Sequence, residues 1–191
     1  MRRLHLSIAV ALFGILALGR SGQAQEPALP ENFTANAIVS NNIRSGAGVI
    51  QMRVTRWTAS TERERFVSTL QSKGPEALLE LLRESPRVGN IRTPDALGYP
   101  LHYAHERNAD GVRHIVLATD RPIGFWEQMN QPRTIDYPFT VVQLEIGENN
   151  RGKGTISYAS KITARGDTIE IENFANAPIM LSDVRSDKRP R

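Results

Sequence analysis

The sequence has 191 residues, no cysteine and a formal net charge of +4. Residues 1–25 hold three arginines and no acid, and three more bases lie in the last four residues, KRPR, so the body between them has a net charge of −2. This distribution argues against a nucleic-acid binder, which shows a clustered basic stripe with stacking aromatics. The lack of cysteine excludes disulfides and a lipid anchor on cysteine.

Residues 1–24 have the pattern of a secretory signal peptide. Two arginines precede an apolar run of 13 residues, 6–18, which Gly19 and Arg20 close. Crossing a bilayer takes about 20 apolar residues, so the run predicts a cleaved signal rather than a membrane span. A single Met precedes the arginines and no cofactor motif follows, which favours Sec export over twin-arginine export. We therefore expect cleavage after Ala24 and a periplasmic or secreted bacterial protein.

The mature chain is expected to form one domain. About 165 residues remain after cleavage, enough to bury some two thirds of the unfolded surface around one core. Residues 25–32 are rich in proline and polar side chains and predict a linker. Residues 33–185 then form a β-rich domain, and residues 186–191 form a basic tail.

The first predicted elements are two strands, FTANAIVSN and VIQMRVTRW. The glycines of the intervening NIRSGAG suit a turn, so the pair predicts a hairpin. In the second strand Ile50, Met52 and Val54 share one face, and Gln51 and Arg53 take the other. This alternation predicts one buried side and one solvated side.

A helical hairpin follows, from TERERFVSTLQSK and PEALLELLRES. Thr61 and Glu64 have the spacing of a capping box, Gly74 ends the first helix, and Pro75 suits the first turn of the second. Both helices carry an apolar stripe, and the second is rich in leucine. Such stripes predict that the hairpin covers a sheet.

Strand patterns then return to the end of the domain. YPLHYAHER and VRHIVLATD flank the turn NADG, and FTVVQLEIG, GTISYASKIT, DTIEIENF and PIMLSDVR follow a longer loop. Short connections imply antiparallel neighbours. The predicted fold is mainly β (α+β): a curved antiparallel sheet or partly closed barrel of eight or nine strands, with the helical hairpin inserted after the second strand and packed over an open face or mouth.

Three histidines remain after signal cleavage. His102 and His105 lie three apart on one predicted strand and so point to opposite faces. His105 and His114 face each other only if Arg107 pairs with Val112 across a four-residue NADG loop; a three-residue loop with a bulge separates them. Zinc sites need three or four converging ligands, so the sequence predicts partly exposed hairpin histidines, no metal site and no cofactor.

The sequence shows no pattern of catalytic residues. It has neither a thiol nor a G-x-S-x-G elbow. Glu170 and Glu172 share a strand face but alternate with isoleucines, as on a solvated face, and GENNRGKG lacks the phosphate-binding pattern. We therefore assign no catalytic residue and favour a protein that is not an enzyme.

The loop between Asp120 and Pro138 is longer than most connections in compact domains, and such loops are usually functional or disordered. Its apolar and aromatic residues argue against disorder. Aromatic faces and arginines suit an amphipathic ligand with an anionic group. The predicted ligand-binding residues are Arg121, Phe125, Trp126, Arg133 and Tyr137. The favoured alternative is a plug, in which the aromatics finish the core and the arginines pair with Asp120 and Asp136.

Three segments, IRTPDALGYPLHYA, IVLATDRPIGFWE and RTIDYPFT, carry a resemblance to a known group. On these residues the chain resembles a family of uncharacterised exported bacterial proteins with no known function. The resemblance covers residues 33–162 and implies a bacterial envelope setting. It carries over no activity, cofactor or site residue.

Three functions remain open at this point. The first is an exported, non-catalytic domain that binds a small apolar or amphipathic ligand beneath the helical hairpin and the 120–138 loop. The second is an envelope protein-protein interaction module that docks through the loop or a sheet edge. The third is a hydrolase with clustered polar side chains in a pocket, using Asp120, Arg121 or Asp136.

Overall fold

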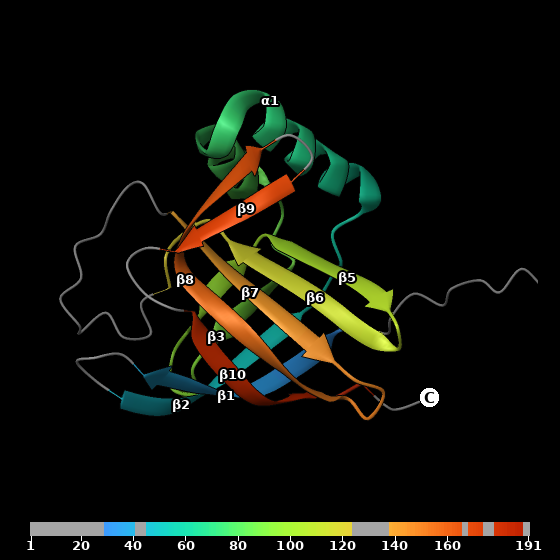
Figure 1. The fold of residues 1–191 in the computed structure, drawn as a ribbon, viewed down its shortest axis with the longest axis vertical. Coiled ribbons are helices and arrows are strands. Elements are labelled where there is room, and N and C mark those ends of the chain that lie inside the picture. The colour runs from blue at the N-terminus through green and yellow to red at the C-terminus, as the bar shows by residue number, and fades with distance from the viewer. Residues whose placement is uncertain (1–28, 41–44, 124–137, 166–167, 174–177, 189–191) are drawn as a thin grey trace, which may run out of the picture.

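The computed structural model describes residues 29–40, 45–123, 138–165, 168–173 and 178–188. The predicted signal peptide and residues 124–137 of the long loop therefore lie outside the described residues. The described chain forms ten strands and one helical element. Its antiparallel sheet curves until it is nearly closed into a barrel (Figure 1). The predicted fold class and the place of the helices after the second strand are confirmed.

The strands follow one another around the sheet in the order β4-β3-β2-β1-β10-β8-β7-β6-β5, and β9 pairs with β8. There are ten strands rather than eight or nine because β3 comes from a segment expected to be loop, and because the expected strand YPLHYAHER is divided at His102 into β4 and β5. The strands are β1 (Glu31–Ser40), β2 (Ser45–Val54), β3 (Gly89–Arg92), β4 (Tyr99–Leu101), β5 (Tyr103–Ala109), β6 (Val112–Thr119), β7 (Phe139–Ile146), β8 (Arg151–Arg165), β9 (Thr168–Asn173) and β10 (Ile179–Ser186). Thus Glu31 and Asn32, expected in the linker, and Ser186, expected in the tail, belong to the sheet.

The barrel interior is filled by apolar side chains from the inner face of the strands. Ile50, Met52 and Val54 of β2 are buried there, while Arg53 is exposed, so the predicted alternation is confirmed. The largest completely buried side chains of this inner core are Phe33, Ile50, Met52, Ile91, Leu101, Ile115, Leu117, Leu144, Ile146, Ile156 and Leu181.

A bulge in β8 turns that strand from the inner core to a second apolar layer. Val141 of β7 pairs with Ser157, but Phe139, two residues earlier, pairs with Ser160, so β8 contains one extra residue here. Because successive side chains alternate between faces, the extra residue reverses the alternation. Ile156 therefore points into the barrel, whereas Ile162 belongs to the outer layer.

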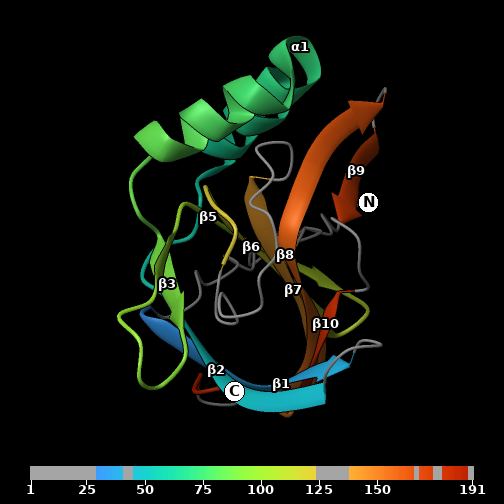
Figure 2. The same cartoon turned by 90° about the vertical axis from the view of Figure 1, so that its left-hand side faces the viewer.

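The helical element α1 (Ser60–Glu84) supplies the other side of this outer layer. It consists of two helices that break at Gly74 (φ 84°, ψ −177°), as predicted. The predicted capping box is wrong in its residues. The helix begins at Ser60, one residue before Thr61, and the backbone N–H of Ala59 donates to Glu62 at 2.9 Å in place of the predicted Glu64. The pair lies over the outer face of the sheet, beside β8 and β9 (Figure 2).

The gap between the two ends of the sheet is bridged by the segment that leads into α1. The N–H of Thr58 donates to the carbonyl of Ala104 in β5 at 2.8 Å, and the N–H of Ala104 donates to Thr58 Oγ1 at 3.0 Å. This pairing satisfies backbone groups on an edge strand that would otherwise be open. The sheet edge proposed as a docking element is thus partly covered at β5.

A buried ion cluster joins β1 to the β5–β6 hairpin inside the barrel. The Arg113 guanidinium donates two hydrogen bonds to Glu31, at 2.8 and 2.9 Å, and two to Glu106, both at 2.8 Å. Ser186 Oγ donates to Glu31 at 2.6 Å. The side chains of Glu31 and Arg113 are 1% and 11% exposed. Burial alone would lower the pKa of Arg113, but the hydrogen bonds that it donates to Glu106 and Glu31 raise this pKa above its usual value, so the guanidinium stays charged.

Candidate functional site

Of the five predicted ligand-binding residues, Arg121 alone is described. Phe125, Trp126, Arg133 and Tyr137 lie outside the described residues. The guanidinium of Arg121 pairs with its neighbour Asp120, with Nε–Oδ1 at 3.1 Å and Nη2–Oδ2 at 3.0 Å. Its side chain remains half exposed. The plug alternative predicted that the arginines of the loop pair with its aspartates, and this pairing is of that kind.

Asp120 is the centre of a polar cluster that sequence reasoning did not find. Its side chain is 5% exposed, and both Arg83 Nε and His102 Nε2 lie 3.8 Å from its carboxylate oxygens. Burial alone would raise the pKa of Asp120, but the hydrogen bond and charge of Arg121 lower it, so the carboxylate stays ionised. Arg83 comes from the end of α1 and His102 from the β4–β5 junction.

His102 is buried, at 7% exposed, so the prediction of a partly exposed histidine is wrong at this position. It lies between β4 and β5 rather than within one strand. Its Nδ1 lies 2.9 Å from the carbonyl oxygen of Ser85. Because a carbonyl only accepts, Nδ1 carries the proton. At 3.8 Å the other nitrogen is too far from Asp120 for a hydrogen bond.

The other two histidines do not face each other. Arg107 pairs with His114, and Ala109 pairs with Val112, so the turn contains only Asp110 and Gly111, both with positive φ. This tight turn is shorter than the loops considered from the sequence. Burial and Arg63 lower the pKa of His105. Among the described residues no group of three His, Asp or Glu side chains could hold a metal ion.

The described base of the long loop is anchored in the barrel. Thr119 Oγ1 donates to the Arg121 carbonyl at 2.5 Å, and the N–H of Ile123 donates to Thr140 Oγ1 at 2.8 Å. Both threonines are fully buried, and Ile123 belongs to the inner core. The described start of the loop therefore packs against the inner core.

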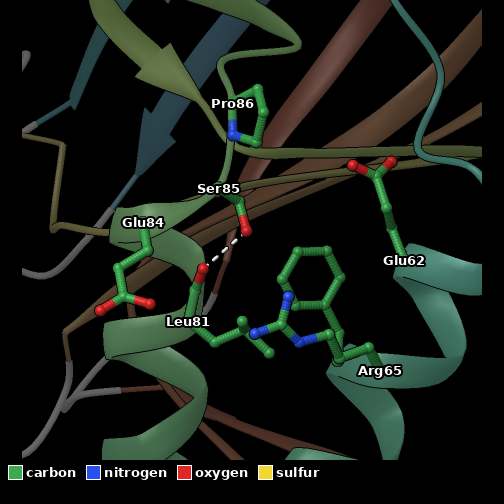
Figure 3. A pocket seen from close by; sticks show the side chains of 7 residues that line it. Glu62, Arg65, Leu81, Glu84, Ser85 and Pro86 are labelled. Carbon is green, nitrogen blue, oxygen red and sulfur yellow. Dashed lines mark hydrogen bonds between the residues drawn. The ribbon is translucent and has the colours of Figure 1, made fainter.

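A small pocket opens between the two helices of α1 (Figure 3). It has a volume of about 190 Å³ and is lined by Glu62, Arg65, Phe66, Leu81, Glu84, Ser85 and Pro86. The start of the first helix therefore lies beside the end of the second. Phe66 and Leu81 are members of the outer apolar layer, whereas the other pocket residues include three charged side chains. The pocket thus joins a charged rim to an apolar floor.

The two apolar regions differ in the exposed fraction of their residues. Of the twenty buried residues of the inner core, all but Ile123 and Ile179 are at most 1% exposed. Of the nine buried residues beneath α1, all but Phe139 are 3–9% exposed. Five further apolar residues of this layer, Leu79 and Tyr103 among them, are only partly buried. The layer beneath α1 is the more open of the two.

Protein-family models, curated proteins and solved structures give no match to this chain. In the part of the chain that the structure describes, no helix is long and apolar enough to cross a membrane.

Ser85 and His102 beside the polar cluster are not aligned as nucleophile and base. Ser85 is the hydroxyl residue in contact with His102, but the contact is through its backbone carbonyl. Its Oγ instead donates to the Leu81 carbonyl at 2.6 Å (Figure 3). Nucleophilic catalysis by a hydroxyl requires a base within hydrogen-bond reach. Among the described residues the cluster is thus arranged to fix α1, the β4–β5 junction and the loop base together.

Proposed function

We propose that the protein is an exported, non-catalytic domain that binds a small apolar or amphipathic ligand beneath α1. The observation that carries this proposal is the pocket between the two helices, whose floor is Phe66 and Leu81 and whose rim is charged. An apolar floor with a few polar groups at its edge is the usual form of a ligand site. Export is the expectation drawn from residues 1–24.

The size and charge of the pocket limit the ligand. Pockets that hold drug-sized ligands have volumes of roughly 300–1,000 Å³. This pocket has a volume of about 190 Å³. The proposed ligand is therefore small, or inserts only one apolar end. Glu62 is already paired with Arg56 at 2.6 Å. The charged side chains at the rim that could contact a polar end of the ligand are therefore Arg65 and Glu84.

The site proposed here lies outside the barrel. Side chains that are almost all completely buried line the inner face of the strands. The layer beneath α1 is more exposed, and the break at Gly74 divides its cover into two helices. A ligand that enters at the pocket reaches this layer without disturbing the barrel core.

A pair of matched variants tests the proposal. Ser85→Phe adds a large side chain at the pocket wall, and Ser72→Phe adds the same side chain at an exposed position of α1. The two serines are alike, since each Oγ donates to a helix carbonyl at 2.6 Å. With N-phenyl-1-naphthylamine as a fluorescent probe, we expect saturable binding by the parent protein and Ser72→Phe, and loss of binding by Ser85→Phe.

Thermal melts of both variants check that the fold survives. Equal probe binding by Ser85→Phe and Ser72→Phe would contradict the proposed site. Native mass spectrometry of the protein purified gently from bacterial periplasm is the second measurement, because a resident ligand adds a discrete mass that Ser85→Phe lacks.

A further inference from the structure

The outer face of β1, β2 and β10 carries a contiguous patch of exposed aliphatic side chains. Ile38 is 46% exposed, Met180 54% and Val49 38%. Ile38 pairs directly with Met180 on one side and with exposed Ala47 on the other. Val49 pairs with Asn36 and is thus a diagonal neighbour of Ile38. These four side chains form the aliphatic patch.

Arginines outnumber acids around the patch. Along the outer face of β2, Val49 is followed by Gln51 and then by Arg53, about 13 Å from Val49 at the usual strand rise. Arg92 of β3 pairs with Gln51. Arg53 and Arg92 are exposed and have no ion pair among the described residues. The single acid in β1, β2 and β3 is Glu31, which points inward to Arg113. The single acid in β10 is Asp183, which is paired with Arg185 at 2.6 Å and with Arg151 at 3.5 Å.

Two features of this face argue against binding of a protein partner. β1 is paired with β2 and β10, and β2 with β1 and β3, so a partner strand has no edge to extend here. Protein interfaces are enriched in aromatic residues, and the exposed residues of these strands include none. The pocket lies at α1, at the other end of the molecule from the β1–β2 hairpin (Figures 1 and 2).

We propose that the aliphatic patch, with Arg53 and Arg92, docks on an anionic lipid surface. Aliphatic side chains that enter the headgroup region and adjacent arginines that face anionic lipid are the two contributions that hold a protein at such a surface. Asp183, the one acid of β10, is paired with Arg185 and Arg151, so the remaining charge of this face complements anionic headgroups. The proposal is independent of the ligand pocket, which remains exposed to solvent when this face is docked.

Vesicle flotation of the purified exported protein tests the proposal. We expect flotation with vesicles of phosphatidylcholine and phosphatidylglycerol at 3:2, little flotation with phosphatidylcholine alone, and release in high salt. Each basic side chain near an anionic surface contributes about a fivefold factor in partitioning. Arg53→Gln with Arg92→Gln should therefore weaken binding about 25-fold. Ile38→Asn with Met180→Asn should weaken it at least about tenfold.

The matched control is Lys73→Gln with Arg107→Gln, which removes the same charge from exposed positions away from this face. We expect this control to float like the parent, with all variants keeping the parent melting temperature. Leu97, between β3 and β4, is a fully exposed leucine outside the patch and serves as an apolar comparison. Three results would overturn the proposal: equal flotation with neutral vesicles, an equal loss in the control, or a loss with Leu97→Ser but not with the Ile38 and Met180 variant. Capture of an acidic envelope protein through this face, with no flotation, would also overturn it.

Discussion

Replacing Arg113 with methionine removes the only cation in the buried cluster and leaves the carboxylates of Glu31 and Glu106 in place. Four nitrogen–oxygen contacts of 2.8–2.9 Å are lost. Each is a charge-assisted hydrogen bond, and Glu31, at 1% exposed, has almost no access to water in exchange. Removing one partner of a buried ion pair costs about 3–5 kcal/mol. We therefore expect Arg113→Met to lower the free energy of unfolding by about 4 kcal/mol.

Urea unfolding followed by circular dichroism measures this change. With an m-value near 2 kcal/mol per molar urea, the midpoint should fall by roughly 2 M. Arg107→Met, on the exposed side of β5, is the control and should change stability by less than about 0.5 kcal/mol. Adding Glu31→Gln to Arg113→Met should recover part of the loss, because one uncompensated charge is removed. A loss under about 1 kcal/mol for Arg113→Met would refute the reasoning, since surface pairs contribute that much.

Three further predictions concern backbone and charge. Gly152→Ala should abolish stable folding, because a Cβ there would lie 1.8 Å from the Glu145 carbonyl oxygen, whereas Gly48→Ala, with nothing within 4 Å, should fold normally by circular dichroism. Gly74→Ala should lower the free energy of unfolding by about 1–3 kcal/mol, since φ +84° with ψ −177° is a backbone region open essentially to glycine alone; an unchanged value would contradict this reasoning. The pKa of Asp120 is lowered in the folded state, so its stabilisation is present above its unfolded pKa of about 3.9 and is lost as the pH falls below it. The stability difference between the parent and Asp120→Asn in urea should thus be largest near neutral pH and shrink below about pH 4; a constant difference would show that the charge is not the cause.

The local patterns of the fold were readable from the sequence because they depend on neighbours in the chain. The alternation of Ile50, Met52 and Val54 predicted a strand with one buried face, and Gly74 before Pro75 predicted the break between two helices. The bulge in β8 was not predicted, since Ser157 and Ser160 carry no local signal of an extra residue. Strand order depends on contacts between distant segments, which a single sequence does not display.

The candidate site was less predictable than the fold. The pairing of Asp120 with Arg121 is local and was anticipated. The approach of Arg83 and His102 to Asp120 depends on how the end of α1 meets the β4–β5 junction, and no spacing in the sequence indicates it. The pocket likewise forms where two helices fold back on each other, so its residues come from both ends of α1.

The bulge in β8 makes a single strand a wall of both apolar regions. Ile156 belongs to the barrel core and Ile162 to the layer beneath α1, six residues further along the same backbone. Contiguous elements that pack on one another can open as one cooperative unit. We therefore expect hydrogen exchange to show one cooperative unit, in which loosening the cover at Ile162 also lowers protection at Ile156. Such a result would mean that the helical insertion contributes to the stability of the barrel itself.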